Sequence, residues 1–476
     1  MLTLGAGLLK FSGCSTAPVS HSSSDSPPNI ILMLADDMGY GDLGCYGQKI
    51  IQTPNIDRMA RNGIRFTQFY AGSTVCAPSR SCLLTGLHTG HANTRGNGKV
   101  SILPDPGEKI IARYLKDAGY ITAMIGKSSV SCVNLDDDFP RKKGFDYSFG
   151  FLSHWEAHDY FPPELYRNGE KIVYPNNTRH EGDAYSQQLF MDDAMRFLEN
   201  NRDKRFFLHL SFQIPHASLY APEEWKAKYR GMWEEVPETT QKHYRNEPEP
   251  RATYAAMVSR LDADVGAVLD KLVELGIADN TLVLFSSDNG TMREGGYDYE
   301  WFDSNGPLKG GKRDMYEGGI RTPLVAMWPR KIKPGTTTDH ISAFWDFLPT
   351  ACDAAGTPAP EGIDGISFLP TLIGSGDQKK HDYLYWEFHQ GGKSGRVKQA
   401  VREGDWKAVR LNAETSPDAP VELYNLKEDI GETNDLATAQ PEIAERLSQL
   451  MRKAHQPGKA FKMPYETAEG ESVQGK

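Results

Sequence analysis

The chain has 476 residues, of which 39% are hydrophobic and 24% charged, and its formal net charge is −10. This length exceeds what one hydrophobic core usually serves, so we expect a large domain with a smaller one beside it. The acidic balance excludes a nonspecific nucleic-acid binder, which needs a basic surface, but it permits a local basic pocket for an anion. We expect no transmembrane helix, because no stretch is apolar for long enough. The six cysteines match neither a zinc pattern nor a dense disulfide framework.

The N-terminus predicts an exported protein. Residues 1–14 read MLTLGAGLLKFSGC, a weakly apolar run that ends in small residues before a cysteine. This ending is typical of a bacterial lipoprotein signal, although no basic residue precedes the run and Lys10 interrupts it. A disordered tail or a cloning remnant is the alternative. We expect a periplasmic or outer-membrane-anchored lipoprotein, tethered through a lipid on Cys14 and the Ser/Pro-rich residues 15–28.

Apolar strands alternate with helices over most of the chain. Asn29–Ala35 is a continuous apolar run, which is typical of a parallel strand covered on both faces. We expect further strands at Tyr120–Ile125, Phe206–Phe212 and Thr281–Ser286, and helices at Pro54–Asn62, Ser81–Leu87, Glu108–Ala118, Ala184–Asn200 and Tyr254–Leu275. The alternation predicts an α/β fold, with a large, mostly parallel β-sheet sandwiched by helices.

The pattern changes near residue 374. Short alternating runs follow at Tyr383–Phe388, Ala400–Arg402, Trp406–Arg410 and Glu422–Leu426, and an amphipathic helix is expected at Pro441–His455. These elements predict a smaller antiparallel sheet with one covering helix. We therefore divide the chain into a signal-like segment and tether (1–28), a large α/β domain (29–374) and a smaller α+β domain (375–476).

Polar side chains follow four of the expected strands. They are Asp36 and Asp37 after the first strand, Lys127 after the second, His216 after the third, and Asp288 and Asn289 after the fourth. Ligands bind beyond the carboxyl ends of parallel strands, so we expect these groups at one edge of the sheet. Oxygen donors suit calcium, whereas zinc prefers nitrogen and sulfur. Either acidic pair alone also fits a turn, but two pairs at equivalent strand ends favour a metal site.

The segment CAPSR, residues 76–80, gives the strongest local signal. It precedes an apparent helix, and a helix N-terminus favours a sulfate or phosphate group. Arg80 supplies a planar guanidinium that fits a tetrahedral oxyanion. The alternatives are a buried, inert thiol for Cys76 and a surface salt bridge for Arg80.

On this motif, C-x-P-S-R, the chain resembles the formylglycine-dependent type I sulfatases of the alkaline phosphatase-like superfamily, and in particular bacterial carbohydrate sulfatases. PNIILMLADDMGYGDLGCYG resembles the first strand and metal-binding turn of that family, and FSSDNG resembles its second metal pair. GPLKGGKRDMYEGGIRTP is similar to the active-site lysine segment, and AVREGDWKAVR and VELYNLKEDIGETNDL are similar to the C-terminal domain. The resemblance covers about residues 28–455.

The resemblance implies a sulfuric ester hydrolase for a sulfated polysaccharide or oligosaccharide. Cys76 would be converted to 3-oxoalanine (formylglycine) by a formylglycine-generating enzyme or an anaerobic sulfatase-maturing enzyme, and its hydrate would be the nucleophile. The implied ligands of a calcium ion are Asp36, Asp37, Asp288, Asn289 and the modified Cys76.

The resemblance also implies roles for the cationic residues. Arg80 and Lys127 would stabilise the hydrate and the sulfate oxygens, while His216 and Lys312 would protonate the leaving alcohol. Many family members read G-K-W-H after the second strand, whereas this chain has serine at 128 and at 129. With Ser129 in place of the histidine, the identity of the base that completes turnover stays open. Another residue or water could serve as the base, or turnover could be slow.

The sugar-binding residues are less well defined by the sequence. SHWEAHDYFPP, residues 153–163, is rich in aromatic residues and His, and Trp155, His158 and Tyr160 are expected to form a sugar-binding wall. A loop that merely covers the core is the alternative. Arg293 and His389 are weaker candidates for contacts with the sugar.

Two other functions fit parts of the pattern. A phosphoric or phosphonic ester hydrolase would bind an anion of the same shape, but it favours additional histidine ligands for zinc. A non-catalytic binder of sulfated glycans would explain the replacement of the usual histidine by Ser129.

Overall fold

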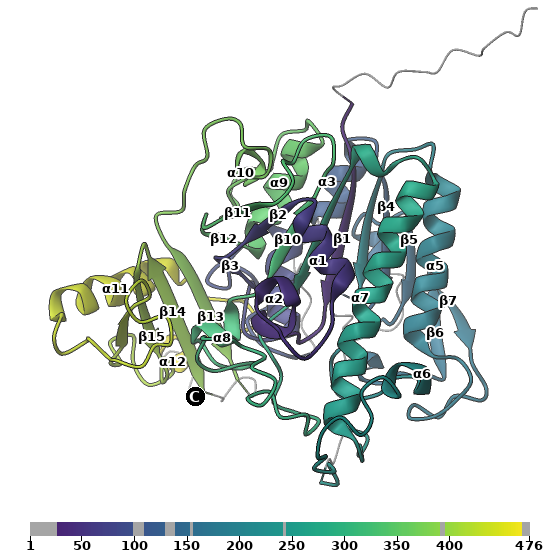
Figure 1. Cartoon of the computed structure of the whole chain (residues 1–476). Helices are drawn as coiled ribbons and strands as arrows, with labels where there is room; N and C mark the ends of the chain where they lie inside the picture. Colours follow the sequence, from purple (N-terminus) through teal and green to yellow (C-terminus); the bar gives the residue numbers. More distant parts are fainter. Residues whose placement is uncertain are drawn as a thin grey trace, which may run out of the picture.

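A ten-stranded mixed sheet forms the centre of the larger part of the molecule (Figure 1). The computed structural model describes residues 26–98, 109–128, 139–152, 156–240, 244–390 and 396–468. The strand order is β11-β2-β10-β9-β1-β8-β4-β5-β6-β7. The strands from β9 to β5 in this order are mutually parallel, while β10, β6 and β7 pair antiparallel with their neighbours. The parallel centre therefore places five carboxyl ends at one edge.

The ten strands of this sheet are short, and the central strands β1, β8 and β9 are buried at every residue. Their bounds are β1 (Asn29–Ala35), β2 (Ile64–Phe66), β4 (Ile121–Gly126), β5 (Tyr147–Gly150), β6 (Glu164–Arg167), β7 (Glu170–Val173), β8 (Phe206–Ser211), β9 (Thr281–Ser287), β10 (Leu324–Met327) and β11 (Thr336–Thr338). A separate two-stranded sheet joins β3 (Phe69–Tyr70) to β12 (Ser342–Ala343). All seven residues of β1 are buried, as expected for a strand with helices on both faces.

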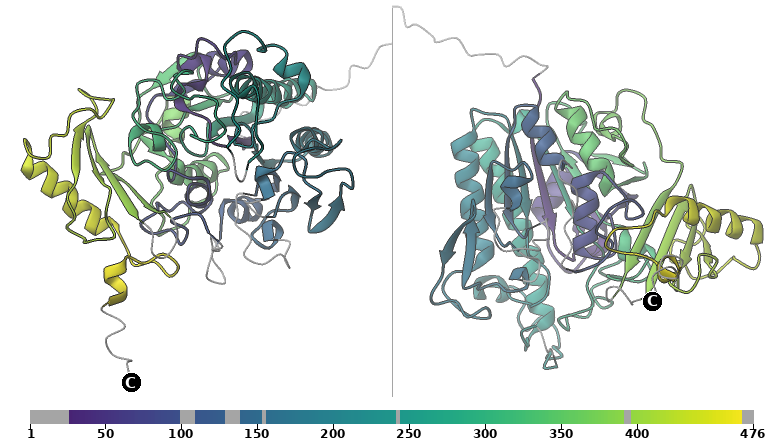
Figure 2. Two further views of the ribbon diagram at one scale, coloured as in Figure 1. Left: turned by 90° about the horizontal axis from the view of Figure 1, so that it is seen from below. Right: turned by 180° about the vertical axis from the view of Figure 1, so that it is seen from behind.

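Helices cover both faces of the sheet (Figure 2). On one face, α1 (Pro54–Arg61), α5 (Ser186–Asn201) and α7 (Pro250–Glu274) pack against alternate residues of β1, including Ile31 and Met33. On the other face, α2 (Cys76–Thr85), α3 (Ile111–Asp117) and α9 (Phe347–Ala354) pack against Ile30 and Leu32. Successive strand residues point to opposite faces, so one apolar run supplies two cores.

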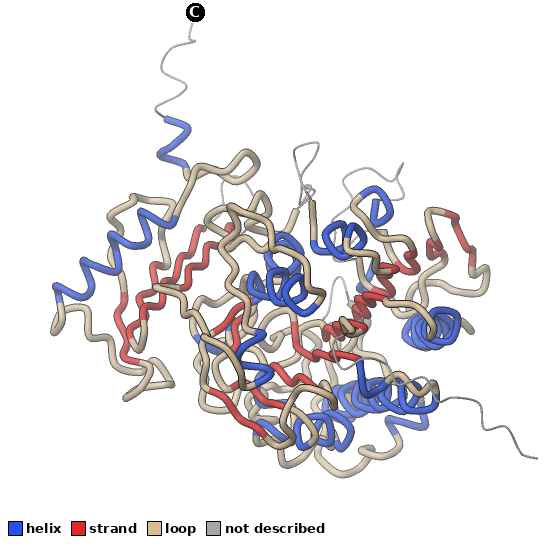
Figure 3. The backbone as a smooth tube through the Cα atoms, turned by 90° about the horizontal axis from the view of Figure 1, so that it is seen from above, coloured by secondary structure: helices blue, strands red, loops and turns tan. Residues whose placement is uncertain are grey.

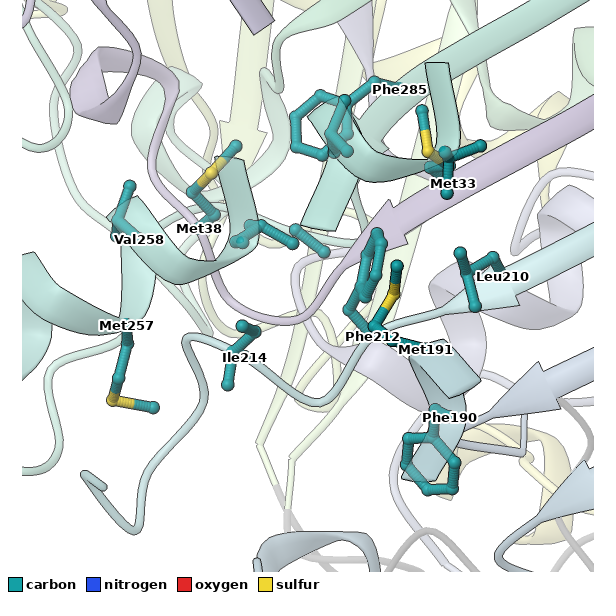
Figure 4. Close-up of a cluster of buried hydrophobic side chains, with 14 of the residues drawn as sticks. Met33, Met38, Phe190, Met191, Leu210, Phe212, Ile214, Met257, Val258 and Phe285 are labelled. Atoms are coloured by element: carbon teal, nitrogen blue, oxygen red, sulfur yellow. The ribbon is translucent and has the colours of Figure 1, made fainter. Parts of the chain in front are cut away.

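Part of the first core is shown in Figure 4. Met33, Leu210 and Phe285 come from three neighbouring strands and belong to one buried cluster with Phe190 and Met191 of α5. Burial of these side chains removes apolar surface from water, which is the main favourable term in folding. The sheet is thereby held rigid beneath the edge that carries the polar residues.

A four-stranded antiparallel sheet forms the smaller part of the molecule (Figure 3). Its strands, in order, are β13 (Leu384–His389), β14 (Val397–Glu403), β15 (Trp406–Arg410) and β16 (Glu422–Asn425). One face packs against α11 (Pro441–Ala454) through Leu447 and Met451. The predicted fold class is confirmed, and the domain boundaries at 28 and 374 stay a prediction.

The remaining helices are short: α4 (Phe139–Lys142), α6 (Glu223–Lys226), α8 (Glu317–Ile320), α10 (Leu369–Ile373) and α12 (Pro464–Ala468). Two predicted helices begin earlier than expected. The helix predicted from Ser81 begins at Cys76, because Pro78 lies in its first turn, where a missing N–H is tolerated. The helix predicted from Tyr254 begins at Pro250 for the same reason. In the part of the chain that the structure describes, no helix is long and apolar enough to cross a membrane.

Buried polar contacts join the smaller sheet to the larger part. The indole Nε1 of Trp386 donates to the carbonyl of Ala71 at 2.9 Å, and the Arg95 guanidinium lies 3.0 Å from the Glu387 carboxylate. Lys407 on β15 bridges Glu317 of α8 at 2.9 Å and a second carboxylate, that of Glu432, at 2.8 Å. The residues before α2 and the segment at α8 are therefore both held by the smaller sheet.

Candidate active site

The oxygen donors predicted to bind a metal lie together. Because β1 and β9 are parallel with Ala35 opposite Ser287, the residues that follow the two strands lie side by side. The backbone N–H of Asp37 donates to Oδ1 of Asp288 at 3.1 Å, and Nδ2 of Asn289 donates to Oδ1 of Asp37 at 2.8 Å. Asp36, Asp37, Asp288 and Asn289 are all fully buried. The register of two strands is thus sufficient to assemble this donor set.

Asp37 has an unusual backbone conformation, with φ of 65°. This left-handed region is uncommon for residues other than glycine, and such residues concentrate at functional sites where the surroundings hold them in place. Two contacts hold Asp37 here, namely its own N–H to Asp288 and the amide of Asn289 to its carboxylate. The turn directs the carboxylate towards the end of β9.

Helix α2 presents Cys76 and Arg80 on one face, because residues four apart lie one turn apart. The guanidinium of Arg80 is fully buried, and its Nε donates to Oδ2 of Asp288 at 2.7 Å. Its Nη2 lies 3.6 Å from Oδ1 of Asp36, and its Nη1 donates to Oγ of Ser211 at the end of β8. No side chain caps the N-terminus of α2, where Cys76 stands. This arrangement favours an anion beside residue 76.

Two buried lysines complete the cluster. Lys127 follows β4, and its Nζ lies 2.5 Å from Oδ2 of Asp36. Lys312 forms an ion pair with Oδ2 of Asp37, and its Nζ lies 3.2 Å from Nε2 of His216. Three cationic side chains therefore alternate with three carboxylates around Cys76.

The donor set fits a hard divalent cation such as calcium. Oδ1 of Asp36 and Oδ1 of Asn289 are buried and have no hydrogen-bond partner among the described residues. Burial of polar oxygens without a partner is costly, and a cation would satisfy both. Burial together with Asp36 and Asp37 raises the pKa of Asp288 to about 7, against the opposing effect of Arg80. A bound cation would keep that carboxylate ionised.

The Cys76 thiol is poorly suited to act as a nucleophile in its unmodified form. Burial raises its pKa, and the opposing effects of Lys127 and Lys312 do not overcome that rise. The thiolate is the reactive form of cysteine, so this thiol stays protonated near neutral pH. The unmodified thiol is therefore a weak nucleophile at neutral pH.

The side chain of His216 is neutral and accepts a hydrogen bond from Lys312. Its Nδ1 contacts the carbonyl oxygen of Ala217, which only accepts, so Nδ1 carries the hydrogen and Nε2 presents a lone pair. Burial and the charge of Lys312 lower the pKa of His216. The ring of His158 stacks on that of His216, with centroids 4.4 Å apart and planes 6° apart. His158 is thus brought to the cluster, as predicted for a residue near the substrate.

The other candidate residues have contacts of their own or lie outside the described chain. The side chain of Arg293 is 45% exposed and pairs at 2.5 Å with Asp314, which comes two residues after Lys312. The buried ring of His389 contacts Glu387 at 2.7 Å, and its backbone N–H donates to the carbonyl of Arg95 at 2.9 Å. Trp155 and Ser129, as well as the N-terminal residues up to 25, lie outside the described residues.

Three residues at the site were not singled out from the sequence. Ser211 contacts Arg80, Oδ1 of Asn97 lies 4.0 Å from Sγ of Cys76, and Tyr244 packs on the two histidine rings. Ser211 ends β8, so the rule applied to the other strand ends could have found it. Asn97 and Tyr244 come from long connections, where the sequence pattern gives no position in space.

A second group with metal-ligand side chains, His88, His91 and Asp364, is explained by hydrogen bonds. Gly90 donates its N–H to Nδ1 of His88, so a neutral His88 carries its hydrogen on Nε2, which faces Asp364 at 3.6 Å. Burial lowers the pKa of His88 to about 4, which keeps it neutral. Nδ1 of His91 lies 2.8 Å from the same carboxylate. The group joins the residues after α2 to those before α10.

Comparison with known proteins places this geometry in a family. The sulfatase family model matches residues 28–357, and the model described as N-sulphoglucosamine sulphohydrolase, C-terminal, matches residues 298–457. The human N-acetylgalactosamine-6-sulfatase is 33% identical over 380 residues, which cover 74% of this chain and 67% of the relative. The chain belongs to the sulfatase family.

Solved sulfatase-like structures share the fold over nearly the whole chain. Ps i-CgsB in complex with k-i-k-neocarrahexaose superposes with a TM-score of 0.77 at 28% identity, covering 93% of this chain and 96% of that one. BT4656 in complex with its substrate D-glucosamine-2-N,6-O-disulfate superposes with a TM-score of 0.72 at 25% identity, covering 90% and 97%. The predicted family and enzyme class are confirmed: this sulfatase is a sulfuric ester hydrolase.

Proposed function

We propose that this sulfatase removes sulfate from a sulfated carbohydrate, using formylglycine formed from Cys76 and a calcium ion. One observation carries the proposal: buried carboxylates and buried cations alternate around residue 76 at the N-terminus of α2. A tetrahedral sulfate needs cations on several sides, and a hard metal ion needs oxygen ligands. Both requirements are met within one cluster.

The charge balance of the cluster supports an anionic substrate with a bound metal. Arg80, Lys127 and Lys312 offset the three carboxylates that they contact. A calcium ion would add two positive charges, and a sulfate monoester brings one negative charge into the same buried space. Electrostatic interactions are strong in such a water-poor site, so attraction of the sulfate is a large part of catalysis.

The residues of the chain have distinct roles in this reaction. A calcium ion would be held by Asp36, Asp37, Asp288 and Asn289 and would withdraw negative charge from the sulfate. A formylglycine hydrate at residue 76 would supply the nucleophilic oxygen. Arg80 and Lys127 bind the sulfate oxygens, since both flank Cys76 and are already aligned by carboxylates.

Proton transfer to the departing alcohol falls to Lys312. His216 accepts a hydrogen bond from the Lys312 ammonium, and Asp37 pairs with the same group, so its position is fixed. Burial favours loss of the proton from Lys312, whereas Asp37 favours its retention and the pKa stays raised. Lys312 therefore enters the reaction protonated and donates to the leaving oxygen as charge develops there.

The names of the relatives support a sugar as the sulfated alcohol. One relative is an N-acetylgalactosamine-6-sulfatase, and one solved structure holds a sulfated glucosamine described as its substrate. At this site, His158 lies beside His216, and the exposed Arg293 stands near Lys312. A ring and a cation at the rim are suited to a polyhydroxylated, charged leaving group.

The test is hydrolysis of matched sulfate and phosphate monoesters by protein coexpressed with a formylglycine-generating or anaerobic sulfatase-maturing enzyme. We expect faster release of sulfate, a Cys76 peptide with the mass of formylglycine, and loss of activity in Cys76→Ala. Faster phosphate release would instead support the phosphate or phosphonate hydrolase. An unmodified thiol with tight binding of sulfated glycan and no turnover would support the non-catalytic binder.

We also propose that the enzyme is exported and tethered through Cys14. The sequence of residues 1–28 supports this proposal, and most of these residues lie outside the described part of the chain. Detergent fractionation of cells that express the full chain should place it with membranes. Cys14→Ala should move it to the soluble periplasmic fraction, and an unchanged distribution would contradict the tether.

A further inference from the structure

Tyr244 lies beside the histidines of the site but has no part in the reaction described above. Its ring centroid is 5.8 Å from that of His158 and 6.0 Å from that of His216, with the planes 66° and 71° apart. The side chain is half-buried, and its hydroxyl makes no hydrogen bond among the described residues. The half-buried ring thus lies beside both histidines, and no described residue holds its hydroxyl.

The position of Tyr244 is fixed relative to His216. The backbone N–H of Arg245 donates to Oγ of Ser218 at 2.9 Å, and Ser218 is buried two residues after His216. The guanidinium of Arg245 lies over the ring of Tyr220, 5.5 Å from its centroid. These contacts tie the residue that follows Tyr244 to the segment that carries His216, so the ring is held beside the stack.

The direction in which the alcohol departs follows from Lys312. The departing oxygen lies near the Lys312 ammonium, which is 3.2 Å from Nε2 of His216. An alcohol that is bound beside Lys312 and His216 therefore has the rings of His158 and Tyr244 as neighbours.

We propose that Tyr244 is the residue that recognises the sugar ring on the departing oxygen, an inference that rests on the proposed function. The aromatic face packs against the C–H groups of the sugar, and the phenol hydroxyl exchanges a hydrogen bond with a sugar hydroxyl. The sulfate group itself is bound on the other side of the departing oxygen, by Arg80 and Lys127. Tyr244 thereby favours a sugar over a flat aryl group as the sulfated alcohol.

The inference is tested with Tyr244→Ala and Tyr244→Phe, each assayed on two kinds of ester. The probes are the 6-sulfates of galactose, N-acetylgalactosamine and N-acetylglucosamine, and 4-nitrophenyl sulfate as the aryl ester. For the best sugar sulfate, Tyr244→Ala should lower kcat/KM by about 10- to 100-fold, mainly through KM, as expected from loss of ring packing and a hydrogen bond. The fold-loss in kcat/KM for Tyr244→Phe should be about a tenth to a third of that for Tyr244→Ala, because the aromatic ring remains.

The ratio of sugar to aryl activity is the decisive quantity, and it should fall at least about fivefold in Tyr244→Ala. Tyr166→Ala is the matched control, because Tyr166 is a half-buried tyrosine on β6 whose hydroxyl contacts Glu164. It should leave the ratio unchanged. Melting temperatures of all variants report on folding, and the ratio is independent of the fraction folded.

The outcomes separate this inference from the proposed function. An enzyme that cleaves both kinds of ester, with an unchanged ratio in Tyr244→Ala, overturns the role of Tyr244 and leaves the sulfatase proposal standing. Cleavage of the aryl ester with no sugar sulfate turned over also overturns it. If the mature protein cleaves no sulfate ester, the proposed function fails and Tyr244 loses its role with it.

Discussion

Lys407 is expected to be one of the most sensitive positions outside the catalytic cluster. It is fully buried between Glu317 and Glu432, with its Nζ at 2.9 and 2.8 Å from their carboxylates. Glu317 begins α8, five residues after Lys312. Lys407→Met keeps the length and apolar stem of the side chain, but it removes the cation and leaves two buried carboxylates facing each other.

The expected loss of unfolding free energy in Lys407→Met can be derived from the pKa of Glu317. Burial raises its pKa, but Lys407, Arg321 and Arg402 together bring it down to about 2, while burial and Glu317 raise the pKa of Glu432. The depression of the Glu317 pKa from its usual 4.5 corresponds to about 3 kcal/mol of stability. Removing one partner of a buried ion pair costs about 3–5 kcal/mol, so we expect Lys407→Met to lose about that much at pH 7.

The sign of the pH dependence is also defined. Because the folded pKa of Glu317 lies below its unfolded value, its contribution is present above pH 4.5 and is lost as the pH falls through about 2. In Lys407→Met both carboxylates lose their cation, so their pKa values rise and protonation relieves the repulsion. The difference in stability between the wild type and the variant should therefore shrink as the pH falls from 7 to 5.

Urea unfolding at the two pH values measures this difference. Lys271→Met is the matched control, because Lys271 also contacts two carboxylates, those of Glu199 and Glu274, but on the surface. The urea midpoint of Lys271→Met should differ little from that of the wild type, because exposed ion pairs contribute little stability. Adding Glu317→Gln and Glu432→Gln to Lys407→Met should recover part of the loss. A Lys407→Met protein within about 1 kcal/mol of the wild type, or a deficit that grows in acid, would refute the reasoning.

Three further predictions concern the site and the core. Lys312→Ala should lower kcat on a sugar sulfate by about 10²–10⁴-fold, and an aryl sulfate with a better leaving group should be affected less; equal losses would contradict its role as the proton donor. Calcium should raise the melting temperature of the EDTA-treated protein, and Asp288→Asn should reduce that rise, as measured by calorimetry. Burial raises the pKa of Asp42 to about 6, so its contribution is complete below pH 3.8 and is lost as the pH rises through 6. Unfolding free energies between pH 4 and 7 should show a decline of about 3 kcal/mol from this group, which Asp42→Asn should abolish.

The strand ends explain why much of the site could be predicted from the sequence. Asp36 and Asp288 each follow a buried, largely apolar strand, and parallel pairing of such strands places both residues at one edge. Arg80 was predicted from its chemistry instead, because a guanidinium at the start of an apparent helix fits a tetrahedral oxyanion. The strand-end inference needs only the direction of the elements.

Other features depend on contacts that the sequence pattern does not encode. Tyr244 reaches the site from the long connection between α6 and α7, so only the folded chain reveals its neighbours. The pairing of His389 with Glu387 is one such contact, because the two residues share a strand face two positions apart. An acidic residue two positions before a histidine in a strand could have indicated that pairing.

The contact between Arg95 and Glu387 has a consequence for the timing of folding. The two side chains are 292 positions apart in the chain. At about 5–20 residues per second, a ribosome needs roughly 15–60 s to travel that distance. Throughout that interval the guanidinium can donate to the nearby carbonyls of Gly90 and Ala92 but has not yet met Glu387, so the residues that follow α2 lack one of their final contacts. The segment that reaches Cys76 through Asn97 is therefore synthesised early and completed late.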